Sequence, residues 1–123
     1  MKNKKNILIV EDETAFLYAM QSKLSIKGFN VETATTGEEG LKLVNDQKFD
    51  LIILDLLLPK MDGYDLLREL KSNPGTEKIP VVIVSNMSDK ENIDSGINLG
   101  AKDFIIKSEY NLDGVVNKIM ELL

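Results

Sequence analysis

Polar or charged side chains stand directly after four short apolar runs of this chain. The runs span residues 7–10, 51–54, 81–84 and 104–106, and the side chains that follow them are Glu11, Asp12, Asp55, Ser85 and Lys107. Three carboxylates, one hydroxyl and one ammonium are the groups that a site for a divalent cation and a phosphoryl group requires. They can act together only if the fold brings the ends of the four runs to one place.

Each apolar run is predicted to be a buried parallel strand. Short stretches rich in Ile, Val and Leu, without a polar alternation, are typical of strands covered on both faces. A weaker alternation from Val31 to Ala34 predicts a further strand at an edge of the sheet. Because ligands of open parallel sheets bind at the carboxyl ends of the strands, the reactive side chains are expected on one rim.

Helical patterns separate the strands. Thr14 to Lys27 is predicted to be a helix that ends at Gly28. Capping boxes at residues 36–39 and 88–91, and a cap at Asp62, predict the starts of three more helices. The apolar positions expected to face the core are Phe16, Met20, Leu24, Leu41, Val44, Leu66, Leu67, Leu70, Ile93, Ile97, Val115, Val116, Ile119 and Leu123. Five strand–helix units in sequence predict a doubly wound α/β fold with a parallel sheet.

The composition narrows the chemistry. A chain of 123 residues corresponds to one domain, taken here as residues 1–123. The absence of cysteine and histidine excludes disulfides, thiolate nucleophiles, zinc sites built from these residues and imidazole bases. Any metal must therefore have oxygen ligands, which favours magnesium, calcium or manganese. With a net charge of −5, the domain lacks the basic surface of a nucleic-acid binder.

The hydropathy pattern argues against a membrane location. No apolar stretch approaches the roughly 20 residues that span a bilayer. Residues 1–6 precede only four apolar residues and then acids, which is not the pattern of a signal peptide. We therefore expect a cytoplasmic protein.

Three alternative α/β sites do not fit the motifs. A dinucleotide site needs glycines at the first strand–helix turn, and this turn reads Glu11-Asp12-Glu13-Thr14. The chain has no Gly-x-x-x-x-Gly-Lys-Ser/Thr phosphate loop. A phosphatase of the haloacid dehalogenase type would carry an aspartate two residues after its nucleophile, and that position holds Leu57.

Several short motifs, weak alone, together resemble the receiver domain of bacterial two-component response regulators over the full length of the chain. The motifs are Val10-Glu11-Asp12, Leu54-Asp55, the loop Leu58-Pro59-Lys60-Met61-Asp62-Gly63, Ser85, and Gly100 to Lys107. The resemblance implies a flavodoxin-like, doubly wound, five-stranded parallel sheet in the order 2-1-3-4-5 with five helices. The carboxylates of Asp12 and Asp55 would then face each other at the switch point between the first and third strands.

The resemblance also implies a role for each site residue. Asp55 would accept a phosphoryl group, Lys107 would pair with Asp55 and then with that group, and Ser85 would donate a hydrogen bond to it. The implied Mg²⁺ ligands are Glu11, Asp12, Asp55 and the backbone carbonyl of Leu57. Glu11 would act through a water, because it is one methylene longer than the aspartate frequent in the family.

The implied function is that of a phosphoacceptor domain. The donor would be the phosphohistidine of a histidine kinase or histidine phosphotransfer protein, and the domain would catalyse its own phosphorylation and slow dephosphorylation without being a conventional turnover enzyme. By resemblance, Ser85 and Phe104 would relay the state to the fourth helix, fifth strand and fifth helix. The alternative is a non-phosphorylated pseudo-receiver that serves as a docking scaffold. It is disfavoured because such domains usually lose the acceptor or an acidic residue, and this chain keeps them all.

The sequence departs from the family pattern at three places. Ser108 follows Lys107 where proline is usual, so the sequence leaves open whether that peptide bond is cis or trans. Asn86 replaces the usual small residue after Ser85. The third departure is the end at Leu123, which is compatible with either a stand-alone receiver or an excised one.

Two further predictions concern partners and lifetime. Ala15, Ala19, Ser22 and Ile26 share one flank of the first helix, where small side chains would let the donor's helix approach closely. Leu57 and Met87 are apolar at positions that in fast-hydrolysing receivers tend to carry amides or carboxylates. They predict a long-lived phosphorylated state.

Overall fold

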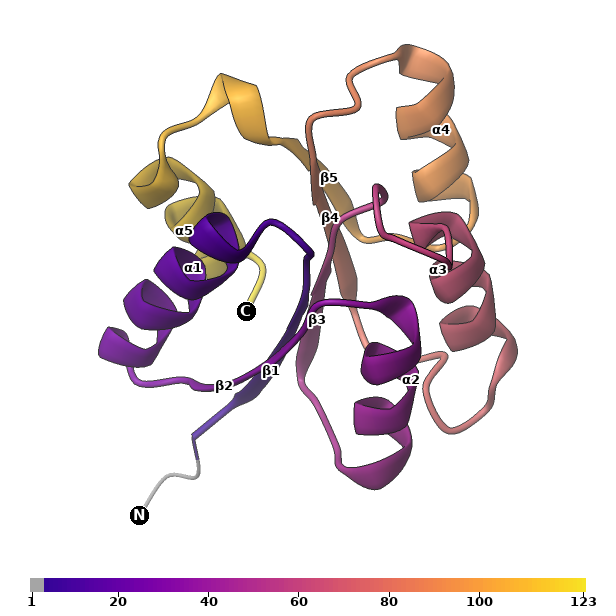
Figure 1. The fold of residues 1–123 in the computed structure, drawn as a ribbon, viewed down its shortest axis with the longest axis horizontal. Coiled ribbons are helices and arrows are strands. Elements are labelled where there is room, and N and C mark those ends of the chain that lie inside the picture. Colours follow the sequence, from indigo (N-terminus) through magenta and orange to yellow (C-terminus); the bar gives the residue numbers. More distant parts are fainter. Residues whose placement is uncertain (1–3) are drawn as a thin grey trace.

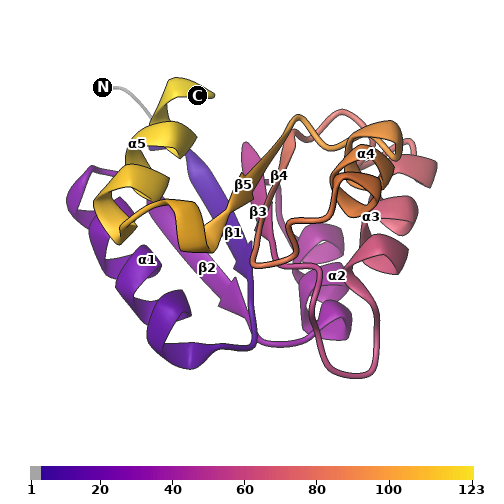
Figure 2. The same cartoon turned by 90° about the horizontal axis from the view of Figure 1, so that it is seen from above.

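The fold is one parallel sheet with helices on both faces. The computed structural model describes residues 4–123. Residues 1–3, at the start of the stretch that does not fit a signal peptide, lie outside the described part. The strands follow the order β2-β1-β3-β4-β5 and all pairs are parallel. Helices α1 and α5 cover one face, and α2, α3 and α4 cover the other (Figures 1 and 2). The predicted sheet order and five helices are confirmed.

The strands lie where the apolar runs predicted them. Their bounds are β1 Asn6–Val10, β2 Asn30–Ala34, β3 Leu51–Leu54, β4 Val81–Ser85 and β5 Asp103–Ile106. In register, Val10 lies opposite Leu54 of β3, and Leu54 lies opposite Ile83 of β4. The chain segments that follow β1 and β3 therefore leave the sheet side by side.

The helices also follow the predicted order. Their bounds are α1 Thr14–Ile26, α2 Gly37–Asp46, α3 Gly63–Ser72, α4 Lys90–Asn98 and α5 Leu112–Glu121, and a short 3-10 helix spans Lys107–Glu109. Gly28 ends α1 with a φ of 100°, a conformation that favours glycine. Within residues 4–123, no helix is sufficiently long and apolar to cross a bilayer.

Two hydrophobic layers sandwich the sheet. On β1, the side chains of Leu8 and Val10 pack into the layer with α3, whereas Ile7 and Ile9 pack into the layer with α1 and α5. All four side chains are at most 1% exposed. This burial on both faces explains why the strands read as continuous apolar runs rather than as alternating ones.

Two predicted helix caps are confirmed and one is wrong. The Thr36 hydroxyl accepts a hydrogen bond from the Glu39 amide at 3.2 Å, and the Asp62 carboxylate accepts one from the Tyr64 amide at 2.9 Å. At the predicted capping box of residues 88–91, the N-cap is Asp89 instead of Ser88, and its side chain makes no cap hydrogen bond. An acidic side chain can still favour a helix start through the helix dipole, without that bond.

The predicted apolar stripe of α1 is confirmed at Met20 and Leu24 but wrong at Phe16. Leu17, Met20 and Leu24 are fully buried, whereas Phe16 is only half-buried. On α4, Ile97 is 42% exposed and Gly96 is the buried position. A Cβ at Gly96 would lie 2.6 Å from Cδ1 of Ile83, so this glycine lets α4 approach β4 closely.

Candidate functional site

The site residues stand on the carboxyl rim of the sheet. The Glu11 amide donates to the Ala34 carbonyl of β2 at 2.9 Å, and the Asp55 amide donates to the Val10 carbonyl of β1 at 3.0 Å. These ladder bonds hold both acidic residues in line with their strands. Their side chains are consequently fixed at the point where β1 and β3 end.

The loop after Asp55 folds back on its own start. The Gly63 amide donates to the Leu56 carbonyl at 3.0 Å. A Cβ at Gly63 would lie 2.5 Å from Cα of Leu56 and 2.6 Å from the Asp55 carbonyl oxygen. Only glycine fits this close approach, so Gly63 shapes the loop on which Leu57 lies.

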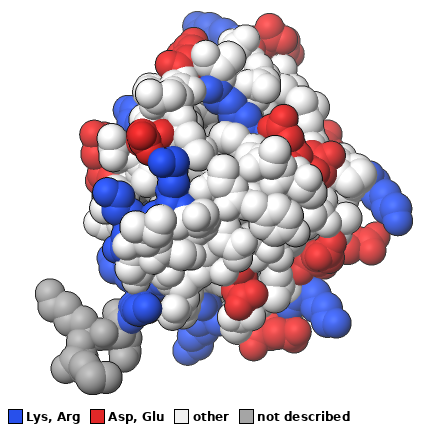
Figure 3. Space-filling view, turned by 60° about the vertical axis from the view of Figure 1, so that its left-hand side comes forward, with Lys and Arg blue, Asp and Glu red and all other residues white. Residues whose placement is uncertain are grey.

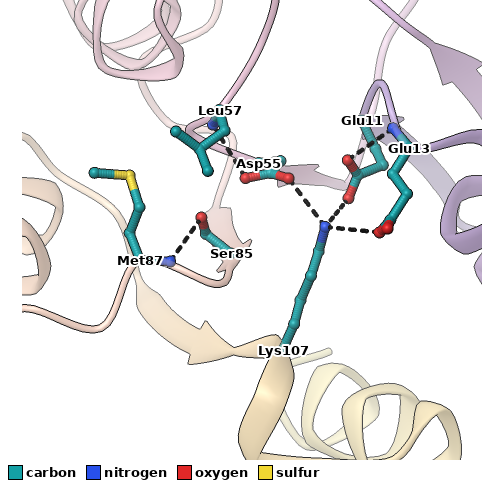
Figure 4. Close-up of polar contacts among 7 residues, drawn as sticks. All are labelled: Glu11, Glu13, Asp55, Leu57, Ser85, Met87 and Lys107. Atoms are coloured by element: carbon teal, nitrogen blue, oxygen red, sulfur yellow. Dashed lines mark hydrogen bonds and ion pairs between the residues drawn. The ribbon is translucent and has the colours of Figure 1, made fainter.

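Asp55 is buried, and both of its carboxylate oxygens have partners. It is 5% exposed. One oxygen, Oδ1, accepts a hydrogen bond from the Leu57 amide at 3.1 Å, and Oδ2 accepts one from Nζ of Lys107 at 3.0 Å (Figure 4). These two donors hold the carboxylate in place at the end of β3.

Lys107 is surrounded by carboxylates. Its ammonium forms ion pairs with Asp55 at 3.0 Å, with Glu11 at short range, and with Glu13 at 3.6 Å (Figure 4). Burial alone would lower the pKa of Lys107, but the hydrogen bonds and negative charges of Glu11 and Asp55 raise the pKa above its ordinary value. Lys107 is therefore a fixed positive charge in this site.

Glu11 is buried beside another carboxylate. It is 2% exposed, and its Oε2 accepts a hydrogen bond from the Glu13 amide at 3.1 Å. Burial raises the pKa of Glu11 from 4.5 to about 7, with the charge of Asp55 adding to the rise and the hydrogen bond from Lys107 opposing it. A bound cation would offset the same burial and repulsion.

Three carboxylates form a cluster that suits a divalent cation. Glu11, Asp12 and Asp55 each offer an oxygen atom, and these atoms lie within 4.8 Å of one another. Asp12 is exposed, so the cluster is open to solvent on its side. Carboxylate oxygens without nitrogen or sulfur ligands fit Mg²⁺, Ca²⁺ or Mn²⁺. The donor set is thus compatible with the predicted magnesium.

Ser85 closes the rim on the β4 side. It is fully buried, and its hydroxyl oxygen accepts a hydrogen bond from the Met87 amide at 3.3 Å. Figure 4 shows Ser85 and Met87 on one side of Asp55 and Glu11 on the other, as expected with β3 between β1 and β4. Ser85 also lies opposite Ile106 of β5, next to Lys107.

The structure thus brings the predicted side chains together, although their roles remain predictions. For Leu57, the amide contacts Asp55 while the side chain is 57% exposed.

Among residues 4–123 no peptide bond is cis, so the bond between Lys107 and Ser108 is trans.

Sequence reasoning missed two contacts of Lys107. Glu13 forms an ion pair with the ammonium, and the ring centroid of Phe16 lies 4.4 Å from Nζ. Two features of the sequence indicate these contacts: an acidic residue, Glu13, directly follows the Glu11-Asp12 pair, and an aromatic residue, Phe16, follows one turn later. A lysine on the same rim can reach both.

Comparisons with known proteins agree with this geometry. Residues 7–119 match the family model described as the response regulator receiver domain. A probable transcriptional regulator, ycf27 of Cyanidium caldarium, is 37% identical over 106 residues, which are 86% of this chain and 41% of that protein. The chain therefore spans less than half the length of this relative.

Solved structures show the same fold. The CheY-like response regulator receiver domain protein from Methanospirillum hungatei JF-1 is 35% identical, with a TM-score of 0.85 and coverage of 97% of this chain and 93% of that one. The phosphorylated cyanobacterial phytochrome response regulator RcpA is 31% identical, with a TM-score of 0.86 and coverage of 98% and 91%.

Proposed function

The chain belongs to the response regulator receiver domain family, and from this membership we propose that it is a magnesium-dependent phosphoacceptor of a two-component phosphorelay. Asp55 receives the phosphoryl group, and the donor is the phosphohistidine of a histidine kinase or histidine phosphotransfer protein. Residues 1–123 act as one receiver domain in the cytoplasm. With a net charge of −5, the domain does not itself bind nucleic acid.

The observation that carries this proposal is the environment of Asp55. Its buried carboxylate accepts a hydrogen bond from the Lys107 ammonium at 3.0 Å and belongs to the acidic cluster. If Asp55 only capped a helix or formed a surface ion pair, it would not need to be buried between the Lys107 ammonium and the other carboxylates of the cluster. Perturbed charged groups gathered on the rim of an open sheet are typical of functional sites.

Phosphoryl transfer needs positioning and charge neutralisation more than acid–base work. A carboxylate oxygen of Asp55 forms the new bond to phosphorus as the phosphorus–nitrogen bond of the donor breaks, and the leaving imidazole nitrogen takes up a proton. Lys107 balances the negative charge of the transferred group, and Ser85 donates a hydrogen bond to one of its oxygens. Solvent supplies that proton, and apart from it the step changes only which atom carries the phosphoryl group.

Magnesium fits the cluster on the β1 side of Asp55. Asp12 and Asp55 would hold it directly, with the Leu57 carbonyl, and Glu11 would hold it through water. When bound, the ion neutralises negative charge on the phosphoryl oxygens. Glu11, Asp12, Glu13 and Asp55 are four acidic side chains against one ammonium, so the site has an excess of negative charge to offer a cation.

The output surface is proposed to lie around α4, β5 and α5. In the unphosphorylated chain, the Ser85 hydroxyl oxygen accepts a hydrogen bond from the Met87 amide at 3.3 Å. A phosphoryl group on Asp55 creates a new acceptor to which this hydroxyl can donate. Phe104 is half-buried on β5 and lies 3.4 Å from a Cβ placed at Gly96 of α4. We propose that a shift of Ser85 changes the position of Phe104 and, through it, the packing of α4 at Gly96.

Acetyl phosphate labelling tests this function. With Mg²⁺ present, intact-mass measurement should detect one phosphoryl adduct, and Asp55→Asn should abolish it. Asp50→Asn is the matched control, because Asp50 is exposed immediately before β3 at the end of the strand opposite Asp55. An adduct that persists in Asp55→Asn, or no adduct on the wild-type chain, would refute the proposal.

A further inference from the structure

The Lys107 ammonium has an aromatic neighbour in addition to its carboxylates. Its Nζ lies 4.4 Å from the centroid of the Phe16 ring, which is within the range of a cation–π interaction. The carboxylates of Glu11 and Asp55 bind it from the buried side, and Glu13 pairs with it at 3.6 Å from a side chain that is 61% exposed. The ammonium is therefore placed between inward and outward negative charges.

The position of Phe16 is not explained by core packing alone. The neighbouring Leu17 is fully buried and fills the core side of α1, whereas Phe16 is half-buried at the margin of the layer. Phe16 also lines a hollow of about 400 Å³ together with Glu13 and Lys107. Its ring thus lies at the boundary between the hydrophobic layer and the site.

A lysine ammonium depends on neighbouring groups to hold its position more than the end of a stiffer side chain does. Its ammonium is a compact charge at the end of a flexible four-carbon stem, so its place depends on what surrounds it. An additional carboxylate in the place of the ring would compete with Asp55 and with an incoming phosphoryl group for the ammonium. An aromatic face attracts the cation and offers no lone pair to compete for its hydrogen bonds.

We propose that Phe16 is a positioning residue of the phosphoryl-transfer site, whose ring face holds the Lys107 ammonium within reach of Asp55 and against the outward pull of Glu13. This inference rests on the proposed function for its kinetic consequence. The placement of the ammonium itself is a property of the unphosphorylated chain. Two separate measurements can therefore test it.

The first measurement is the NMR chemical shift of the Lys107 ε-methylene protons in the magnesium-free protein. Protons above an aromatic face resonate upfield, so Phe16→Leu should move these signals toward ordinary lysine values. Phe16→Tyr keeps the ring and should keep the shift. Signals that do not move in Phe16→Leu would overturn the inference, whatever the phosphorylation results show.

The second measurement is the rate of labelling by acetyl phosphate at saturating Mg²⁺. Phe16→Leu should slow it by about fivefold, as the loss of a modest cation–π contact and of ammonium alignment implies. Phe16→Tyr should restore the wild-type rate. Phe29→Leu is the matched control, because Phe29 is half-buried against the same layer but follows the far end of α1.

The outcomes separate the two proposals. Equal slowing by Phe29→Leu, or no rescue by Phe16→Tyr, would show a general packing effect and would overturn the positioning role. A wild-type chain that takes no label refutes the proposed function, and the Lys107 signals then decide the placement alone. Upfield signals lost only in Phe16→Leu, with slowing and rescue, support the inference.

Discussion

Glu11 is a buried carboxylate that lies beside a second carboxylate, Asp55, and pairs with the Lys107 ammonium. Its pKa rises from 4.5 to about 7 chiefly because it is buried. Between about pH 4.5 and 7, the folded state therefore keeps a proton on Glu11 that the unfolded state releases. The stability that Glu11 contributes is fully present below about pH 4.5 and is lost as the pH rises through about 7.

Glu11→Gln should therefore stabilise the metal-free domain more at pH 8 than at pH 4.5. The pH-dependent part is on the order of 3 kcal/mol, because each unit of pKa shift corresponds to about 1.4 kcal/mol. Urea unfolding at the two pH values, in the presence of a chelator, measures it. The exposed Glu38→Gln is the control and should show no such dependence. A variant whose advantage shrinks with rising pH would contradict the assignment.

The residues around Asp55 also predict the lifetime of a phosphorylated state. The Leu57 side chain is 57% exposed and that of Met87 is half-buried, and neither can hold a water by hydrogen bonding. Misplacing a reacting water by about 1 Å costs on the order of 100-fold in rate. We therefore expect the acyl phosphate to last far longer than seconds in Mg²⁺ buffer.

The combined substitution Leu57→Asn and Met87→Glu should speed its decay by at least about tenfold, because both new side chains can orient a water. Loss of the adduct with time, followed by intact mass, measures the rate. Asn86 is exposed beside Ser85 and carries an amide, so Asn86→Ala tests whether that amide contributes. A wild-type half-life of seconds, or no acceleration in the double variant, would refute the prediction.

At the scale of elements, the sequence predicted what local patterns determine. The strands of this sheet are apolar on both faces, so each run and the polar residue after it could be located directly. The N-cap of α4 could not, since Ser88 and Asp89 are both good caps and the structure uses Asp89 without its side chain. The close packing of α4 through Gly96 depends on Ile83 of another strand. Likewise, the contact of Phe16 with Lys107 depends on how a flexible side chain that follows β5 lies over α1.

The outer flank of α1 predicts a docking surface for the phosphodonor. Ala15, Ser22 and Ile26 are exposed, with Ile26 at 81%, and Ala19 is half-buried. Three of the four flank residues are therefore at the surface, where a partner can reach them. Figure 3, which brings the left-hand side of Figure 1 forward, shows a broad area without charged side chains on this face. Small and uncharged side chains would let a partner helix approach closely.

Ala19→Arg should slow transfer from a histidine kinase that labels the wild-type chain by at least about tenfold, because a bulky charge would separate the two helices. Acetyl phosphate labelling of the same variant should remain close to the wild-type rate. Ser25→Arg is the control, since Ser25 is exposed on α1 outside this flank. Equal loss with both donors would mean that the flank supports the fold instead.

At the scale of the whole molecule, the two hydrophobic layers are joined by the strands that they share. Ile9 and Val10 are adjacent on β1, yet Ile9 packs into the layer with α1 and α5 and Val10 into the layer with α3. If one layer unfolded, it would expose to solvent the same strands that support the other layer. We therefore expect residues 4–123 to unfold as one cooperative unit, as one receiver domain should.

Leu24→Ala and Leu70→Ala test this expectation from opposite faces. Leu24 is 0% exposed on α1 and Leu70 is 1% exposed on α3. Each substitution leaves a cavity and should lower the free energy of unfolding by about 2–5 kcal/mol. Because the strands are shared, urea unfolding followed by circular dichroism should stay a single transition in both variants, with an unchanged dependence on urea concentration. Met120→Ala, at a side chain that is 38% exposed, should cost less than about 1 kcal/mol. Hydrogen exchange that accelerates only in the helices on the substituted face, while the opposite layer keeps its protection, would show that the two layers unfold separately.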